Sequence, residues 1–411
     1  MKHVIVGAGP AGVIAAETLR AADTGADITI IGDEPEPPYS RMAIPYVLTG
    51  KIDEPGTYLR KGEGHFDKLN IKVVHSRAEK VDPGANSVTV DGKNVSYDRL
   101  LIATGSRPVK PPIPGLDLPG IHHCWTLEDS RHIAGLAKKG AKVVLMGAGF
   151  IGCIILEALV ERGTELTVVE MGDRMVPRMM NRSAGNMIRR WCEKEGVTVY
   201  TGTRADGVDQ AGEGLKVTLS NGKTLDADLV VVATGVAPNT EFLDGSGIKT
   251  DIGILVNEYL ETSVPGIYAA GDVAEGFDFS TGARAVQAIQ PTAADHARAA
   301  ALNMSGARTR FQGSLGMNVL DTLGLISTSF GLWNGVGGGE RAEAMDEENF
   351  RYVSLEFDED QLVGAITLGH TDHVGVLRGL IQTGTHLGAW KQRLMEDPTR
   401  VMEAYLAATQ A

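Results

Sequence analysis

Two short stretches of this sequence resemble each other and decide its fold. Residues 3–12 read HVIVGAGPAG, and residues 142–152 read KVVLMGAGFIG. Each stretch contains apolar residues typical of a strand, then a glycine-rich turn, then the first turn of a helix with apolar periodicity. The sequence therefore predicts two related α/β units that begin in the same way.

A second pair of stretches follows in the same order. LLIATGSRP at residues 100–108 corresponds to LVVVATGVAP at residues 229–238, and both strands end in Ala-Thr-Gly. GIYAAGD at residues 266–272 matches neither start, and we interpret it as the return of the chain to its first domain. We predict an α/β fold with two Rossmann-like dinucleotide-binding domains, the first discontinuous, and a C-terminal α+β domain.

The expected domain boundaries follow changes in composition. The stretch VKPPIPGLDLP at residues 109–119 is rich in proline, which stiffens the chain and ends helices. We expect the first domain to comprise residues 1–112 and 248–309, and the second residues 113–247. Alternating strands and then helices predict a third domain over residues 310–411, which would serve as an interface or dimerisation domain.

Bulk properties exclude several classes of function. The net charge of −13 argues against non-specific binding to nucleic acid or anionic lipid. No apolar run approaches the roughly 20 residues that cross a bilayer, and no signal peptide is recognisable, so we expect a cytoplasmic protein. The three cysteines have no CxxC spacing and the histidines have no metal-ligand spacing, so we expect no disulfide framework and no metal.

The first glycine motif is Gly7-x-Gly9-x-x-Gly12. The first glycine permits a tight turn, the second lets a pyrophosphate approach the backbone, and the third allows close packing of helix on strand. The helix N-terminus then offers free N–H groups to the phosphates. Asp33 and Glu34 follow the next strand and are placed to accept hydrogen bonds from a ribose. The alternative is a tight turn with solvated surface acids.

The second motif is Gly147-x-Gly149-x-x-Gly152, and Glu170 follows the next strand. A carboxylate at that point bonds the 2′-hydroxyl of NAD and repels the 2′-phosphate of NADP. Arg174 and Arg178 lie close by in the sequence and weaken this discrimination, unless they are ordinary surface charges. We therefore expect NAD(H) in preference to NADP(H).

Together, the two glycine motifs, the two Ala-Thr-Gly strands and the late Gly271-Asp272 resemble the FAD-dependent pyridine nucleotide–disulfide oxidoreductases. The resemblance implies that the first unit binds FAD, that Asp272 holds its ribityl and phosphate part, and that Ala78 contacts the adenine. It also implies that the helix beginning near Pro291 points its N-terminus at the flavin. The residues expected at the FAD are Gly7, Gly9, Pro10, Ala11, Gly12, Asp33, Glu34, Arg41, Ala78, Ala103, Thr104, Gly105, Arg107, Gly271, Asp272 and Gln290. Those expected at the NAD(H) are Gly147, Gly149, Phe150, Ile151, Gly152, Glu170 and Gly235.

Residues 37–46, PPYSRMAIPY, narrow the resemblance. This segment, which we call the flavin-side segment, is similar to that of NADH oxidases, coenzyme A-disulfide reductases, rubredoxin and ferredoxin reductases, and the flavoprotein part of nitrite reductases. Members that reduce disulfides or peroxides carry a redox cysteine where this chain has Met42, which cannot form a thiolate. Many relatives also place a glutamate near the nicotinamide, and some pair it with a lysine in the flavin-side segment. This chain has Ile154 at the position of the glutamate and Tyr46 at the position of the lysine.

The resemblance implies an FAD-dependent NAD(P)H oxidoreductase that passes hydride from NADH to the flavin and electrons onward to a redox protein. The acceptor is then a ferredoxin, a rubredoxin or an iron–sulfur enzyme, and no residue of the chain acts as a covalent catalyst. One alternative is an NADH oxidase or diaphorase that uses O2 or small acceptors. Another is a weakly catalytic FAD-binding subunit of a larger redox complex. Relatives use the C-terminal domain either as a dimer interface or as a lid over the flavin, so a homodimer is one expectation.

Overall fold

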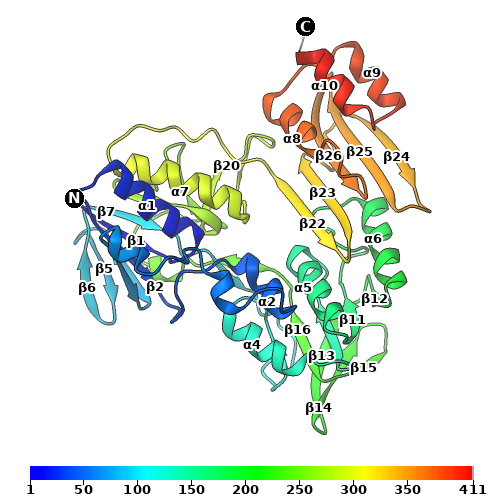
Figure 1. The fold of residues 1–411 in the computed structure, drawn as a ribbon, viewed down its shortest axis with the longest axis horizontal. Helices are drawn as coiled ribbons and strands as arrows, with labels where there is room; N and C mark the ends of the chain where they lie inside the picture. Colours follow the sequence, from blue (N-terminus) through cyan, green and yellow to red (C-terminus); the bar gives the residue numbers. More distant parts are fainter. Residues whose placement is uncertain (410–411) are drawn as a thin grey trace. The chain divides into compact units, whose positions relative to one another are not determined.

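A computed structural model describes residues 1–409 of the chain and divides into two compact units. The first unit contains Met1–Ala43, Ile52–Arg107 and Val236–Ser314. The second contains Ile44–Lys51, Pro108–Gly235 and the chain from Leu315 onward. Each unit is therefore assembled from segments that lie far apart in the sequence (Figure 1).

The first unit is built on a five-stranded parallel sheet in the order β19-β7-β1-β2-β3. Its strands are β1 (Lys2–Val6), β2 (Asp27–Gly32), β3 (Ile71–His75), β7 (Arg99–Ile102) and β19 (Ile267–Ala269). Helices α1 (Pro10–Ala22) and α7 (Gln290–Met304) pack side by side in the same core (Figure 1). Pairing of β19 with β7 confirms that the chain returns to the first α/β domain near residue 267.

Smaller elements complete the first unit. Val81, Val88 and Val90 of an antiparallel three-stranded sheet join the apolar core. That sheet consists of β4 (Ala78–Asp82), β5 (Ser87–Val90) and β6 (Lys93–Ser96). The remaining strands are β18 (Ile254–Leu255), β20 (Ala274–Phe277) and β21 (Arg284–Ala285), and β8 (Ser106–Pro108) pairs with β17 (Val236–Pro238). The short helices are η1 (Arg41–Ala43), η2 (Glu54–Thr57), α3 (His65–Lys68), η3 (Glu241–Leu243) and η4 (Gly271–Val273).

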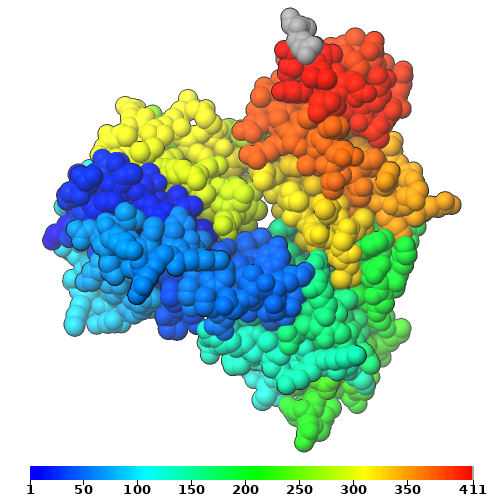
Figure 2. Space-filling model, in the orientation of Figure 1, coloured from blue at the N-terminus to red at the C-terminus, as the bar shows by residue number. Residues whose placement is uncertain are grey.

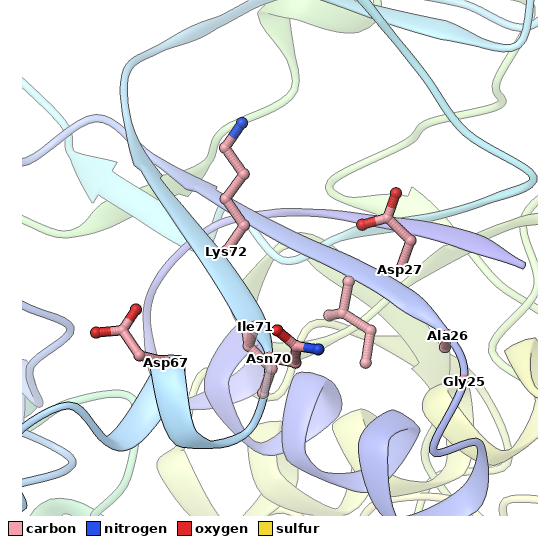
Figure 3. Close-up of a pocket in the computed structure, with 8 residues that line it drawn as sticks. Gly25, Ala26, Asp27, Asp67, Asn70, Ile71 and Lys72 are labelled. Carbon is pink, nitrogen blue, oxygen red and sulfur yellow. The ribbon is translucent and has the colours of Figure 1, made fainter.

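A hollow of about 530 Å³ lies at the amino ends of β2 and β3 (Figure 3). Its lining is mostly polar and consists of Gly25, Ala26, Asp27, Ile28, Asp67, Asn70, Ile71 and Lys72. The glycine turn at Gly7 follows the carboxyl end of β1, which is parallel to both strands. Because ligands of such sheets bind at the carboxyl ends of the strands, this hollow is not the dinucleotide site.

The second unit contains a second five-stranded parallel sheet, in the order β12-β11-β10-β16-β9. Its strands are β9 (Ile121–His122), β10 (Lys142–Met146), β11 (Glu165–Val169), β12 (Thr198–Tyr200) and β16 (Leu229–Val232). An antiparallel sheet of β13 (Ala205–Ala211), β14 (Gly214–Leu219) and β15 (Thr224–Ala227) shares its apolar core. The accompanying helices are α2 (Ile44–Leu48), α4 (Leu127–Leu136), α5 (Phe150–Glu161) and α6 (Arg182–Lys194).

The C-terminal part of this unit is a five-stranded antiparallel sheet in the order β22-β23-β26-β25-β24, followed by three helices. Its strands are β22 (Met317–Thr322), β23 (Leu325–Gly331), β24 (Glu340–Asp346), β25 (Arg351–Asp358) and β26 (Gln361–Leu368). The helices are α8 (Val374–Thr383), α9 (Ala389–Glu396) and α10 (Val401–Thr409), which reach the molecular surface (orange to red in Figure 2). Strands followed by helices confirm the expected α+β arrangement. Among the residues that the structure describes, no helix combines the length and apolarity needed to cross a membrane.

Candidate functional site

The first glycine turn connects β1 to α1 and is held by close backbone contacts. Gly7 has a φ of +122°, and a Cβ there would lie 2.0 Å from the Ala103 carbonyl oxygen. A Cβ on Gly12 would lie 1.9 Å from the Gly7 carbonyl oxygen. A Cβ on Gly9, by contrast, would meet nothing within 4 Å. Gly7 and Gly12 are thus required by the fold, whereas Gly9 leaves open the space that a pyrophosphate needs.

The second glycine turn repeats this geometry between β10 and α5. Gly147 has a φ of +99°, and its Cβ would lie 2.5 Å from the Ala233 carbonyl oxygen. A Cβ on Gly152 would lie 2.1 Å from the Gly147 carbonyl oxygen, and one on Gly149 would meet nothing within 4 Å. Both units therefore carry the same cradle. Pro10 and Ala11 lie in the first turn of α1, and Phe150 and Ile151 in the first turn of α5, where free N–H groups favour phosphate.

Glu170 follows β11 and lies against the second glycine turn. Its Oε2 accepts a hydrogen bond from the Ala148 N–H at 2.7 Å, and its Oε1 accepts one from the Gly172 N–H at 2.6 Å. Each carboxylate oxygen can accept a further bond, so the position suits a ribose hydroxyl. Arg174 donates to the carbonyls of Met180 and Pro177 and pairs with Asp173, which commits its guanidinium to the loop.

The corresponding acids of the first unit differ in their contacts. Asp33 is exposed. Glu34 accepts a hydrogen bond from Arg41 Nη2 at 2.5 Å and another from the Tyr39 hydroxyl. Arg41, the first residue of η1, therefore orients Glu34, which follows the end of β2. Tyr39 was not expected from the sequence, although it belongs to the flavin-side segment.

Asp272 is a buried carboxylate with an unusual environment. It lies in η4, and its Oδ2 accepts a hydrogen bond from Ser106 Oγ at 3.0 Å. Burial raises the pKa of this carboxyl, while the Ser106 hydrogen bond and the charge of Arg41 lower it. A backbone hydrogen bond of Asp272 itself also lowers this pKa. An ionised buried carboxylate gains from further hydrogen-bond donors, and the hydroxyl groups of a ribityl chain are donors of the required kind. Neighbouring Gly271 packs closely against Ala11 of α1: a Cβ added to Gly271 would lie 3.3 Å from the Ala11 Cβ.

The end of β7 is fixed by the segment that follows β17. Thr104 and Asn239 exchange two hydrogen bonds: the Thr104 hydroxyl donates to the Asn239 carbonyl, and Asn239 Nδ2 donates to the Thr104 carbonyl, both at 2.9 Å. The Asn239 N–H also donates to the Gly105 carbonyl at 3.0 Å. Arg107 donates to the Pro238 carbonyl at 2.9 Å and pairs with Glu241. Asn239 thus holds Thr104 and Gly105, a role that sequence reasoning missed.

The other expected residues lie at element ends. Gln290 begins α7 and accepts a hydrogen bond from Ser40 Oγ at 2.7 Å, which ties the flavin-side segment to this helix. Ala78 begins β4 and is buried. Gly235 has a φ of +123° after β16, in the place that Gly105 occupies after β7. The residues expected at the FAD all belong to the first unit, and those expected at the NAD(H) all belong to the second.

The environments of the thiols in this chain disfavour thiol chemistry. Met42, in the position of the redox cysteine of relatives, is 49% exposed. All three cysteines are buried, and burial raises the pKa of Cys124 and Cys192 to about 12 and that of Cys153 well above its ordinary value. Thiolates at these positions are therefore strongly disfavoured. Within residues 1–409 no group of three or more histidine, cysteine or acidic side chains is arranged to hold a metal ion.

The missing charged pair has no direct replacement. Ile154 lies in the second turn of α5, and Tyr46 in α2 is 53% exposed. Glu157, one turn further along α5, has a pKa that is raised by burial and by the nearby carboxylate of Asp321. A different ion pair lies nearby: Lys51, three residues beyond the end of α2, has its Nζ 2.9 Å from Oε1 of Glu161, the last residue of α5.

Comparisons with known proteins agree with this geometry. Residues 1–300 match the family model described as pyridine nucleotide-disulphide oxidoreductase. The chain is 31% identical to the NADH-dependent phenylglyoxylate dehydrogenase subunit epsilon of Aromatoleum evansii, over 99% of this chain and 98% of that protein. It is 28% identical to the rubredoxin-NAD(+) reductase of Ectopseudomonas oleovorans, over 93% and 99% of the two chains. Its structure matches that of an NAD-dependent persulfide reductase from A. fulgidus with a TM-score of 0.88 and 29% identity, over 94% of this chain and 78% of the other.

Paired glycine cradles, the carboxylates at their strand ends and a family match over most of the chain lead to one conclusion. The chain belongs to the pyridine nucleotide-disulphide oxidoreductase family and is an FAD-dependent oxidoreductase that uses NAD(P)H.

Proposed function

We propose that the first unit holds FAD and the second holds NADH, and that the electrons leave the flavin for a redox protein rather than for a thiol or a metal of this chain. The observation that carries this proposal is Met42, which stands where thiol-dependent relatives have their redox cysteine. The burial of all three cysteines supports it, because none of them is disposed to ionise. The flavin is then the single redox centre that the chain brings to the reaction.

The chain's own contribution is to bind and orient the two nucleotides. When bound there, FAD would supply the redox chemistry, that is, acceptance of hydride from NADH and transfer of the electrons to an acceptor. The turn at Gly9 would receive the FAD pyrophosphate, and Asp272 would hold the ribityl hydroxyls with its buried carboxylate. The N-terminus of α7, at Gln290, would place a partial positive charge near the flavin ring. The turn at Gly149 and the carboxylate of Glu170 would hold the adenosine half of NADH and disfavour NADPH.

The nature of the acceptor rests on the relatives that match this chain along its whole length. The phenylglyoxylate dehydrogenase relative is named as one subunit of a multi-subunit enzyme, and it aligns with this chain from end to end. The rubredoxin-NAD(+) reductase relative is named for a small electron carrier. Both names point to a protein acceptor. We favour an acceptor protein that binds this chain as a partner subunit, because the more similar of the two relatives is itself a subunit.

We also propose the domain assignment that this function needs. Residues 1–112 and 248–309 would form the FAD-binding domain, and residues 113–247 the NAD(H)-binding domain. Residues 310–411 would form the domain that contacts the partner or a second copy of the chain. The independent antiparallel sheet from β22 to β26 supports a separate third domain.

A steady-state assay tests this function. The purified chain is given NADH or NADPH together with ferredoxin, rubredoxin, O2 or an artificial dye. We expect NADH to be preferred and a protein carrier or dye to be reduced much faster than O2. Rapid consumption of NADH in air without a carrier would favour an NADH oxidase, the activity of a Methanocaldococcus jannaschii relative that is 33% identical over 76% of this chain. Purification with a stoichiometric partner, and negligible dye reduction by the chain alone, would favour a weakly catalytic subunit.

A further inference from the structure

Helix α2 follows the flavin-side segment in the chain but packs with the second unit. It contains five residues, Ile44–Leu48, and contacts α4 and α5. Ile44 and Leu48 are 2% and 0% exposed. The short helix is thus buried against the same helix, α5, whose N-terminus forms the second glycine turn. Helix α2 directly follows η1, whose residues belong to the first unit.

A single guanidinium group fixes α2 in this place. Arg162 caps the C-terminus of α5, and its Nη1 donates a hydrogen bond to the Leu48 carbonyl at 2.7 Å. Its Nη2 and Nε donate to the carbonyls of Ala134 and Ala137 at 2.6 Å and 2.8 Å. All three carbonyls lie at the C-terminal ends of α2 and α4, where the helix itself provides no partner. A positive charge at such ends is also favoured by the helix dipoles.

These three hydrogen bonds join parts of the chain that are distant in sequence. Leu48 and Arg162 are separated by 114 positions. The donors are charged and the bonds are short, which makes each of them stronger than a bond between neutral groups. Arg162 is partly buried, so water competes less effectively for its donors. The Lys51–Glu161 ion pair lies beside it, but its side chains are 51% and 38% exposed and contribute little.

We propose that Arg162 is a positioning residue for the reduction of the flavin by NADH. It fastens the end of the flavin-side segment, through α2, to the helix that carries the NADH pyrophosphate turn. Some relatives pair a glutamate near the nicotinamide with a lysine of the flavin-side segment, and this chain has Ile154 and Tyr46 at those places. The Arg162 clamp gives the chain a different link between the flavin-side segment and α5. The inference depends on the NADH-to-flavin reaction and not on the identity of the acceptor.

The chain contains a matched control for this clamp. Arg20 of α1 also places its guanidinium on backbone carbonyls: Nε on Leu69 at 2.7 Å, and Nη2 on Ala26 at 2.8 Å and on Asn70 at 2.9 Å. Two of these residues, Ala26 and Asn70, line the hollow at the amino ends of β2 and β3 (Figure 3). Arg20 Nη1 also donates to the carbonyls of Asp23 and Thr24, at 3.3 Å and 2.8 Å. Loss of Arg20 therefore removes five such bonds from the fold, against three for Arg162, but at the edge of the sheet remote from the glycine turn.

The experiment compares Arg162→Ala, Arg162→Lys and Arg20→Ala as FAD-loaded proteins. Anaerobic stopped-flow mixing with NADH gives the rate of flavin reduction. Calorimetric titration with NAD⁺ gives binding to the second unit, and hydrogen–deuterium exchange reports on residues 44–51. We expect Arg162→Ala to lower the reduction rate about 10- to 100-fold, the usual effect of slightly misplaced reactants. We also expect faster exchange in residues 44–51 and an unchanged FAD content.

The other variants and a second half-reaction decide between positioning and general stability. Arg20→Ala should lower the melting temperature but leave the reduction rate at the wild-type value. Arg162→Lys keeps the charge but loses the planar fork, so its rate should be intermediate, and it serves as the test if Arg162→Ala does not fold. Dithionite-reduced Arg162→Ala should be reoxidised by dye at the wild-type rate. A wild-type rate of flavin reduction in the Arg162 variants, or an equal loss in Arg20→Ala, would overturn the proposal.

Discussion

Replacing Gly149 with alanine separates nucleotide binding from folding in the second unit. In the protein without nucleotide, the new methyl group has no atom within 4 Å. The backbone at Gly149 has φ of −76° and ψ of −168°, an extended conformation that alanine adopts without strain. We therefore expect the free energy of unfolding to change by no more than about 1 kcal/mol.

The effect on nucleotide binding is expected to be much larger. The open space beside Gly149 is where the pyrophosphate would lie, so the methyl group would displace it. Overpacking of this kind costs about 1–3 kcal/mol, which corresponds to an about 5- to 150-fold weaker affinity for NADH. FAD binding should be unaffected, because the first glycine turn is unchanged.

The assay has three readouts and one control. Denaturation in urea gives stability, the flavin absorbance gives the FAD content, and titration with NADH gives the affinity of the second unit. The control is Gly152→Ala, whose methyl group would lie 2.1 Å from the Gly147 carbonyl oxygen and should destabilise the fold. Wild-type NADH affinity in a folded Gly149→Ala protein would refute the assignment of this turn.

Three further predictions concern charged and titratable groups. Asp272→Asn should weaken FAD binding about 10-fold or more, which a flavin fluorescence titration measures. It should also leave the apoprotein as stable as the wild type, or more stable, near neutral pH. Burial raises the pKa of the Asp272 carboxyl, so the wild-type protein loses stability as the pH rises through that pKa, and melting curves at pH 5 and pH 8 test this. Glu170→Gln should raise kcat/KM for NADPH relative to NADH about 10-fold, because the charge that repels a 2′-phosphate is removed; an unchanged ratio would count against Glu170. Burial lowers the pKa of His296 to about 4, so the unfolded state binds the proton at a higher pH than the folded state does. Acidification from pH 6.5 towards 4 should therefore lower the free energy of unfolding by about 3 kcal/mol. His296→Phe should lack that part of the acid destabilisation, and an identical pH profile for the variant would contradict this.

The features that the sequence predicted correctly are those with local causes. The turns at Gly7 and Gly147 follow from backbone conformations that favour glycine, so the pattern of glycines identifies them. The strands Lys2–Val6 and Lys142–Met146 are also recognisable locally, since the last four residues of each form a continuous buried run. The recurrence of Ala-Thr-Gly correctly indicated that both units close in the same way.

The features that the sequence did not reveal depend on contacts between distant residues. Asn239 bonds Thr104 across 135 positions, and Arg162 bonds Leu48 across 114. Neither residue stands out in its own neighbourhood. Strand Glu340–Asp346 was not expected either, because its sequence ERAEAMD carries charges at most positions and lacks an apolar alternation. The roles of the individual residues at the two nucleotide sites and the exact domain boundaries stay predictions.

The measurement that tests the central claim most directly is an anaerobic titration of the FAD-loaded chain with NADH. If the two glycine cradles serve one reaction, about one equivalent of NADH per flavin should bleach the flavin absorbance completely. The same titration after replacement of Gly149 by alanine should require much higher concentrations. A chain that takes up no flavin, or a bound flavin that stays oxidised in excess NADH, would contradict the account.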